Sequence, residues 1–455
     1  MSAPVESQFE DYCSALAAVL GHADRHQPAK LYLKGLLLPG ERKSVEPMAA
    51  RVCPENVRSA HQSMNHLVAA ADWSDHAVLG VAAGCVCPEL SKKDERCWWI
   101  VDDTSHVKKG QHSVGVARQY CGRLGKRDNC QVAVSLSFAN TYGSMPLDYR
   151  LYLPEEWTSD RARCHKAGVP ENIEFRTKGQ IAREQIARAL ANNIPPGIVL
   201  ADAGYGTEAD FRDWLQTQKL DYVLGVRDSA SVWWGKHQPA KIPEWPAEGR
   251  RRPLIRRDAR HQPVSLLYVA RALPSKMWRN ITWRQGSNSP LSSRFARVRV
   301  RASHHDRLRD EEWLLIEWPE GETEPVHYWL STLPQDISFR QLVSHALGRW
   351  MIERDYEELK SELGLSQYEG RNWRGFHHHA TLCIAAYAFL MLQRLRGKKN
   401  SAALKQPPIP ENFRPRGSRA DAATQSVVDR QHPFPSGPRD RADVGSLPLL
   451  RETVA

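Results

Sequence analysis

Hydrophobic residues follow two different spacings in the first third of the chain. Up to about residue 94 they recur every three or four positions, as Phe9, Tyr12 and Leu16 do, and this spacing predicts a helical N-terminal domain over 1–94. From Cys97 the pattern becomes that of strands, with three short runs rich in strand-forming residues. These runs span residues 98–103, 130–138 and 148–153, and their closeness along the chain predicts an antiparallel meander.

Helices and strands then alternate. One face of the segment 177–193 is apolar at helical spacing, and Pro195 ends that helix. An apolar strand follows at 198–202, then a second helix, then a fifth strand at 222–226. Residues 95–227 therefore predict the element order β-β-β-α-β-α-β, which is typical of an α/β domain with a mixed five-stranded sheet and flanking helices.

The remaining chain divides into three parts. Residues 228–336 contain short alternating strands, many Trp and Arg residues and frequent Pro, which predicts a β-rich insertion. A helix resumes at Ser338 and is expected to run to Leu363, so that 337–396 completes the α/β domain with its last helices. The tail, 397–455, is rich in Pro, Arg, Asp and Ser and lacks apolar periodicity, and we predict that it is disordered.

Composition favours an anionic partner. The formal net charge is +11 and the pI about 9.2, which suits nucleic acid or an anionic membrane surface. The membrane alternative lacks support, because no strongly amphipathic basic helix is apparent and no segment reaches the ~18 uninterrupted apolar residues of a membrane span. The N-terminus has neither the basic nor the apolar region of a signal peptide. We therefore expect a cytoplasmic protein without a membrane partner.

Several conspicuous residues have structural explanations. The nine cysteines show no paired C-x2-C spacing, so reduced and mostly buried thiols are expected. His377, His378 and His379 open an apolar helix; one of them could face DNA or the catalytic site, but direct metal ligation is not favoured. Tryptophans of the insertion are interleaved with basic runs such as 249–260, which suits unstacked bases and phosphate, although most of them are expected in a small β core.

Three acidic positions lie where an RNase H-like core brings acids together. Asp102 and Asp103 end the first strand, Asp202 ends the fourth strand, and Glu353 lies in the resumed helix. An Asp at a strand end is often only a turn residue, but this order of elements is that of acids that converge on one pocket. Such a pocket can hold two Mg²⁺ ions about 3.5–4 Å apart for phosphoryl transfer, with Mn²⁺ as a substitute.

Three segments resemble the bacterial insertion-sequence transposases of the DDE superfamily, in the group with β-strands between the second Asp and the Glu. They are DDTSHVKKGQHSVGVARQYCGRLGKRDNCQVAVSLSF (102–138), VLADAGYG (199–206) and RWMIERDYEELKSELGLSQYEGRNWRGFHHH (349–379). The resemblance covers about residues 98–395 and implies that the catalytic, metal-binding acids are Asp103, Asp202 and Glu353. Asp102 stays as an alternative to Asp103, because neighbours on a strand point to opposite faces.

That group carries the signature Tyr-x2-Arg-x3-Glu-x6-Lys. Arg349, Glu353 and Lys360 stand at the matching positions, whereas Ala346 replaces the Tyr, so no role of that Tyr carries over. Arg349 shares a helix face with Glu353, and the resemblance implies that Arg349 and Lys360 contact DNA phosphates beside a metal ligand. An ordinary ion pair on a solvated helix is the competing interpretation.

Further basic residues follow the first acid. Lys108 and Lys109, and beyond them Arg118 and Arg123, could also contact DNA phosphates. A charged surface hairpin is the alternative interpretation of the same residues.

The resemblance implies a DNA transposase of an insertion sequence, associated with the nucleoid. It would bind the terminal inverted repeats of its element and the target DNA, as a homodimer, and the helical N-terminal domain could take part in this binding. Two Mg²⁺ ions would support strand cleavage and attack of the 3′-OH on target DNA. The alternatives are a non-catalytic DNA-binding regulator or domesticated relative, and a nuclease that cuts without joining.

Overall fold

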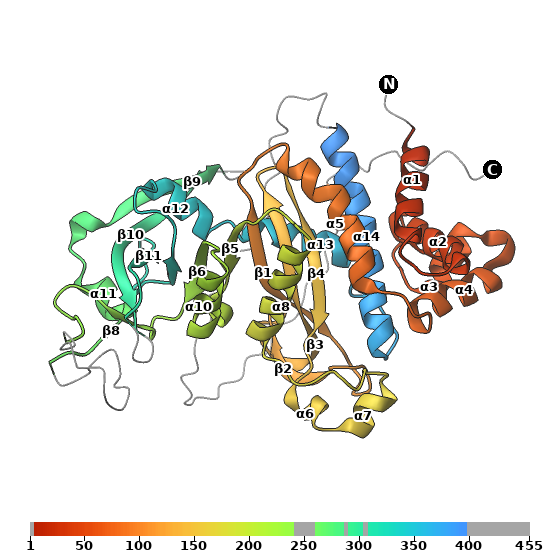
Figure 1. Ribbon diagram of the computed structural model, residues 1–455, viewed down its shortest axis with the longest axis horizontal. Helices are drawn as coiled ribbons and strands as arrows, with labels where there is room; N and C mark the ends of the chain where they lie inside the picture. The colour runs from red at the N-terminus through yellow and green to blue at the C-terminus, as the bar shows by residue number, and fades with distance from the viewer. Residues whose placement is uncertain (1–3, 241–259, 286–289, 304–307, 398–455) are drawn as a thin grey trace, which may run out of the picture.

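A computed structural model of the chain describes residues 4–240, 260–285, 290–303 and 308–397 (Figure 1). The predicted disordered tail, 397–455, lies outside these residues except for Gly397, and so does nearly all of the basic run 249–260. The described chain is a mixed α/β structure with helices around one large mixed sheet.

The N-terminal stretch is helical. It contains α1 (Val5–Ala17), η1 (Ala23–Arg25), α2 (His26–Leu37), α3 (Val45–Val52), η2 (Pro54–Asn56), α4 (Val57–Ala69) and α5 (Asp75–Ser91). Helix α5 carries apolar residues on all sides and packs against both α14 (Trp373–Gly397) and the sheet. Helices α1 to α4 lie beyond α14 at one end of the molecule, whereas α5 is part of the layer that covers the sheet (Figure 1).

The central strands are built around β1 (Trp98–Val107). This strand pairs antiparallel with β3 (Lys126–Asn140) and parallel with β5 (Ile198–Ala201). Strand β4 (Gly143–Leu151) pairs antiparallel with β3, and β6 (Tyr222–Val226) pairs parallel with β5. A short extra strand, β2 (Ala117–Cys121), forms a hairpin with β3. The spatial order is thus β4-β3-β1-β5-β6, in which the expected antiparallel meander and the later parallel strands both occur.

The β-rich insertion widens this sheet instead of standing apart from it. Its elements are β7 (Ser231–Trp233), β8 (Val264–Ser265), α11 (Leu266–Ala272), η3 (Ser275–Met277), β9 (Arg279–Gln285), β10 (Pro290–Ala302), β11 (Glu312–Glu317) and β12 (His327–Ser331). Strand β12 pairs antiparallel with β6, so the five-stranded sheet of the prediction is part of a 12-stranded sheet. The physical reason is that the edge of β6 offers unpaired N–H and C=O groups, which β12 satisfies.

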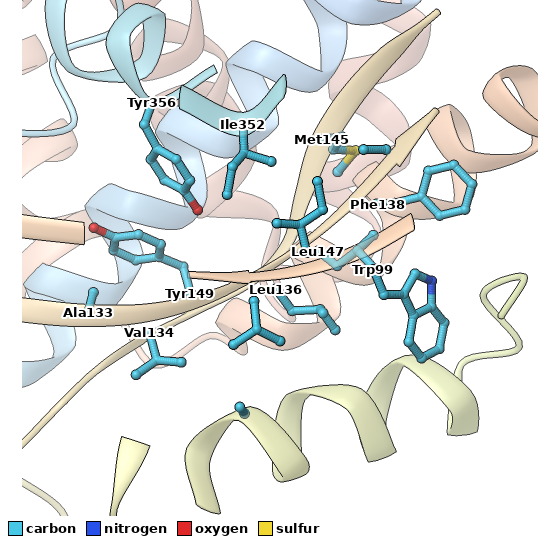
Figure 2. Close-up of a cluster of buried hydrophobic side chains, with 14 of the residues drawn as sticks. Trp99, Ala133, Val134, Leu136, Phe138, Met145, Leu147, Tyr149, Ile352 and Tyr356 are labelled. Atoms are coloured by element: carbon cyan, nitrogen blue, oxygen red, sulfur yellow. The ribbon is translucent and has the colours of Figure 1, made fainter. Parts of the chain in front are cut away.

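Helices cover both faces of the central strands. Beyond those already given they are α6 (Glu155–Thr158), α7 (Arg161–Lys166), α8 (Lys178–Ala191), α9 (Ala203–Gly206), α10 (Ala209–Thr217), α12 (Phe339–Ala346) and α13 (Trp350–Ser361). Figure 2 shows Ile352 and Tyr356 of α13 pointing onto Tyr149 and Leu147 of β4, while Trp99 of β1 points to the opposite face, where α8 lies. The buried side chains of α13 therefore fix that helix on one face of the sheet.

The helix predicted from Ser338 to Leu363 is broken in the structure. Helix α12 ends at Ala346 and α13 begins at Trp350, with Gly348 in the gap. A side chain at Gly348 would come within 3.1 Å of Leu200 on β5, so the glycine lets this corner pack closely on the sheet. The break was missed because apolar periodicity continues across it. Beyond α13, Gly364 has a φ of 71°, a left-handed conformation that commonly ends a helix.

Helix α14 is the last helix of the described chain, and 19 of its residues are buried against the rest of the protein. None of the described helices has the length and apolar character that crossing a membrane requires. The nine cysteines are free, and seven of them are buried, as expected for reduced structural thiols.

Candidate active site

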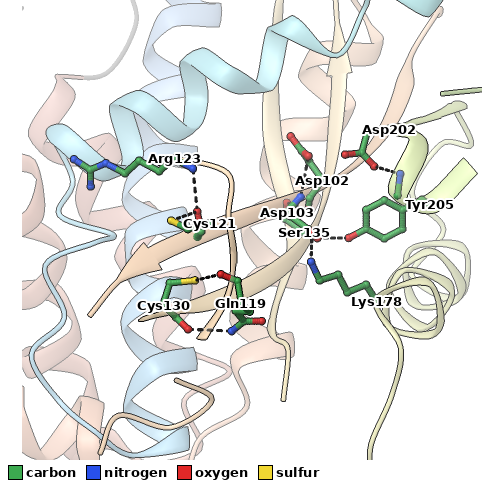
Figure 3. Close-up of polar contacts among 12 residues, drawn as sticks. Asp102, Asp103, Gln119, Cys121, Arg123, Cys130, Ser135, Lys178, Asp202 and Tyr205 are labelled. Atoms are coloured by element: carbon green, nitrogen blue, oxygen red, sulfur yellow. Dashed lines mark hydrogen bonds and ion pairs between the residues drawn. The ribbon is translucent and has the colours of Figure 1, made fainter. Parts of the chain in front are cut away.

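Two aspartates lie close together where β5 ends beside the middle of β1, which continues past its predicted end at Asp103 to Val107. Strands β1 and β5 pair in register at Ile100 and Leu200, and two residues further on each strand reaches an aspartate, Asp102 and Asp202. Asp202 also begins α9, where its Oδ1 accepts a hydrogen bond of 2.8 Å from the backbone N–H of Gly204. Figure 3 shows the two carboxylates on the same side of the sheet.

Arg349 lies among these carboxylates. Its Nη2 donates a hydrogen bond of 2.8 Å to Oδ1 of Asp102. Burial opposes the charge of this guanidinium, but Asp102, Asp202 and Glu353 together outweigh burial and raise the pKa of Arg349. The arginine that begins α13 therefore faces all three acids.

Two of these carboxylates, Asp102 and Glu353, hold their protons more tightly than free acids do. Loss of water raises the pKa of Asp102; Arg349 opposes the rise, and Asp202 and Asp103 add to it. For Glu353, loss of water and then repulsion by Asp102 outweigh attraction by Arg349 and raise the pKa to about 7. The middle of β1, the end of β5 and the helix α13 thus bring three acids, Asp102, Asp202 and Glu353, to one place.

Asp103 points the other way. Its carboxylate accepts hydrogen bonds from Tyr205 of α9 and from Lys178, the first residue of α8 (Figure 3). Side chains alternate along a strand, so Asp103 shares the face of Trp99, which α8 covers, whereas Asp102 shares the face that α13 covers. The acid that the resemblance implies is therefore next to the cluster along the chain but on the opposite face of β1.

Tyr205 and Lys178 were not among the predicted site residues. Tyr205 is buried and lies three residues after Asp202, within the segment that carries the resemblance. Its polarity at a buried position was the available signal. Lys178 gave no signal, because a lysine in the first turn of a helix is ordinary on a surface.

Comparison with known families identifies the kind of protein. A model of the DDE superfamily endonucleases matches residues 15–290, more than half of the chain, and the matched segment includes Asp102, Asp103 and Asp202. This chain belongs to the DDE superfamily of endonucleases. Glu353 lies beyond the matched residues, so the geometry described above is what links it to Asp102 and Asp202.

This chain is also similar to the probable transposase for insertion sequence element IS701 of Microchaete diplosiphon. It is 25% identical to this chain over 232 residues, which make up 51% of this chain and 57% of the relative. The chain thus spans less than two thirds of the length of this relative.

DDE superfamily enzymes generally use divalent metal ions, and the acid cluster has suitable chemistry. Carboxylate oxygens are ligands that Mg²⁺ prefers. Among the described residues, however, no three His, Cys, Asp or Glu side chains are close enough to hold a metal ion as they stand. The guanidinium of Arg349 neutralises Asp102 in this arrangement, so the carboxylates would have to exchange that cation for a metal ion.

The predicted DNA-binding lysines belong to the two segments that carry Glu353 and Asp102. Lys360 is two helical turns beyond Glu353 on α13, and burial lowers its pKa. Lys108 follows β1, and its Nζ donates a hydrogen bond of 3.0 Å to the backbone oxygen of Tyr368. Lys109 is exposed beside it.

The three consecutive histidines fasten separate elements to α14. His377 Nε2 accepts from the backbone N–H of Leu151 on β4 at 3.2 Å, and His378 lies against Trp73 with ring centroids 3.7 Å apart. His379 Nδ1 is 2.8 Å from the hydroxyl of Tyr32 on α2, and its Nε2 is 2.9 Å from the backbone oxygen of Gly364. These contacts explain the histidine run as a structural junction.

Aromatic residues of the insertion also have structural partners. Trp233, Trp313 and Trp329 are buried, as expected for a β core. The guanidinium of Arg284 on β9 lies 3.6 Å from the ring centroid of Trp350, the first residue of α13. The insertion therefore touches the helix that carries Arg349 and Glu353. Trp245 lies outside the described residues.

Proposed function

We propose that this protein is the DNA transposase of an insertion sequence, which cleaves the ends of its element and joins the freed 3′-OH to target DNA. The observation that carries the proposal is the convergence of Asp102, Asp202 and Glu353 around Arg349. Membership of the DDE superfamily and the similarity to a probable transposase support it.

The fold gives independent support. The strand order β4-β3-β1-β5-β6, with three antiparallel strands followed by two parallel ones, is the order expected of an RNase H-like core. In that core the acids stand on the first strand, at the end of the fourth strand and on a late helix. Asp102, Asp202 and Glu353 occupy those places in this chain once β2 is counted as an extra hairpin strand.

We assign the first acid to Asp102 in preference to Asp103. Asp102 shares a face of the sheet with α13, whereas Asp103 is bonded to Lys178 and Tyr205 on the other face. Asp102, Asp202 and Glu353 would hold one or two Mg²⁺ ions. Bound there, such ions activate the attacking oxygen and stabilise the leaving oxygen of the phosphodiester.

The remaining residues would orient the DNA. Once the acids bind metal, Arg349 is free to pair with a phosphate oxygen, to which its guanidinium is well suited. Lys360, Lys108 and Lys109 would contact phosphates further along the strand and fix its register. The partners are the terminal inverted repeats and target DNA, and a homodimer would bring the two ends together.

The test is a cleavage assay with the full chain and DNA that spans the flanks of the gene, in Mg²⁺ or in EDTA. We expect metal-dependent cuts at defined ends and joined products, both lost in Asp202→Ala and in Glu353→Gln. Glu357→Gln is the matched control, because Glu357 is an exposed acid one turn further along the same helix.

The outcomes separate the proposal from its alternatives. Cuts without joined products would indicate a nuclease that cuts only. DNA binding without cleavage by the wild type would favour a non-catalytic regulator. Cleavage that survives Glu353→Gln would remove Glu353 from the site.

A further inference from the structure

The hairpin formed by β2 and β3 brings one arginine towards the acid-bearing helix. Ser105, three residues beyond Asp102 on β1, fixes the end of this hairpin: its Oγ accepts hydrogen bonds of 3.3 Å from the backbone N–H of Arg123 and from the thiol of Cys121. Figure 3 shows the side chain of Arg123 extending away from Cys121. The backbone of Arg123 is thus held close to β1, the strand that carries Asp102, and the side chain of Arg123 is exposed.

Arg123 faces a lysine that lacks an acidic partner. After burial, Arg123 is the largest influence that lowers the pKa of Lys360, which shows that the two cations lie near each other. Burial, and after it Lys360, Lys108, His379 and Arg123, lower the pKa of the His106 imidazole. Three cations, from the end of β1, the hairpin and α13, therefore lie within electrostatic range of one residue.

Nearby acids are already engaged. Asp102 attracts Lys360 but is bonded to Arg349, and Glu369, which attracts Lys108, pairs with Arg42 at 3.2 Å. Across the part of the chain that the structure describes, no carboxylate lies within ion-pair distance of Lys360 or Arg123. Like charges held together without a counter-ion repel each other, which an external anion would relieve.

We propose that Arg123 forms, with Lys360 and Lys108, a binding site for one phosphate of the DNA backbone. The inference rests on the proposed function and adds a residue that the transposase signature does not contain. Lys360 is seven residues beyond Glu353, roughly 10 Å along the helix, so the phosphate lies a few nucleotides from the cut. The guanidinium supplies paired donors and the lysines supply point charges.

The test measures binding of the full chain to duplex DNA from the flank of the gene, in EDTA so that no cleavage occurs. Affinity is followed against NaCl concentration for the wild type, Arg123→Ala, Arg123→Lys and Arg127→Ala. Arg127 is a matched control, because it is an exposed arginine of the same hairpin whose Nη2 contacts the backbone oxygen of Arg118.

Loss of one phosphate contact reduces the slope of log K against log salt by about 0.9. We expect that reduction in Arg123→Ala, a slope near that of the wild type in Arg123→Lys, and no change in Arg127→Ala. An unchanged slope in Arg123→Ala, with the wild type binding and cleaving DNA, overturns this inference alone. Failure of the wild type to bind or cleave any flank overturns the proposed function instead.

Discussion

Arg349 donates a hydrogen bond of 2.8 Å to Asp102, although 246 residues separate them in the sequence. The bond joins the middle of β1 to the start of α13, the two elements that carry the first and last acids of the cluster. It also explains how acidic side chains are tolerated together, because one guanidinium faces all three carboxylates. The same bond distinguishes Asp102 from its neighbour Asp103.

Substitution of the two neighbouring aspartates should separate their roles. We expect Asp102→Asn to reduce the cleavage rate at least 100-fold, because removal of a charged metal ligand weakens stabilisation of the transition state by about 3 kcal/mol or more. Asp103→Asn keeps an oxygen that can accept from Tyr205, so a reduction of less than about 10-fold is expected. Single-turnover cleavage in saturating Mg²⁺ measures both. The reverse ranking would restore Asp103 as the ligand.

Arg349→Met should make the protein more responsive to metal ions. Without the guanidinium the carboxylates repel each other, so we expect a loss of about 2 kcal/mol and a Tm lower by a few degrees in EDTA. Mg²⁺ no longer has to displace a bound cation, so it should raise the Tm of this variant more than that of the wild type. Thermal unfolding with and without Mg²⁺ measures this. Arg354→Met, at an exposed position of α13, is the control, and an equal Mg²⁺ effect in both variants contradicts the idea.

Acid should destabilise the junction at His379. Burial lowers the pKa of His379 from 6.5 to about 4, although a hydrogen bond to the oxygen of Gly364 partly opposes this. Between these values the unfolded chain binds a proton that the folded chain does not, so stability falls as pH falls. At ~1.4 kcal/mol per pKa unit, we expect this histidine to account for a loss of about 2 kcal/mol between pH 7.5 and pH 5.

Urea unfolding across that pH range tests the role of His379. His379→Gln should be less stable at pH 7.5 but lose less stability on acidification than the wild type. His66→Gln, at an exposed position, should lose as much as the wild type does. Equal losses in all three proteins would show that other groups control the acid response.

Close packing beneath Asp202 should make one glycine irreplaceable. A Cβ at Gly206 would lie 2.7 Å from Cβ of Leu224 and even closer to the backbone oxygen of Gly225, both on β6. We expect Gly206→Ala to cost about 2–3 kcal/mol and to reduce cleavage, because α9 and Asp202 must shift. At Gly84 of α5 nothing lies within 4 Å, so Gly84→Ala should stabilise by about 0.5–1 kcal/mol. Denaturant unfolding compares the two, and an unperturbed Gly206→Ala would contradict the packing argument.

The sequence alone reduced the candidate catalytic acids to four. Strand-forming runs end at Asp102, Asp103 and Asp202, and a resumed helix carries Glu353, because local periodicity reports where strands and helices lie. The motif segments then indicated the superfamily, and the family comparison agrees. The helical N-terminal stretch, the antiparallel meander and the β character of the insertion were also predictable, since each depends on neighbours along the chain.

Other features depend on contacts between distant residues. The insertion joins the sheet because β12 pairs with the free edge of β6, and the helix breaks where Gly348 packs on Leu200. Arg123 comes within electrostatic range of Lys360, 237 positions further along the chain, only in the folded protein. The periodicity of one segment does not indicate which strand will pair with the edge of a sheet. Nor does it indicate which side chain from a distant segment will lie opposite a given residue.

The neighbours Asp102 and Asp103 illustrate both what the sequence determines and what depends on the tertiary structure. The sequence by itself determined that Asp102 and Asp103 point to opposite faces of one strand, because strand side chains alternate. Only the tertiary structure decided which face meets Arg349 and Glu353, because that depends on α13 packing through Ile352 and Tyr356 on one face while α8 covers the other.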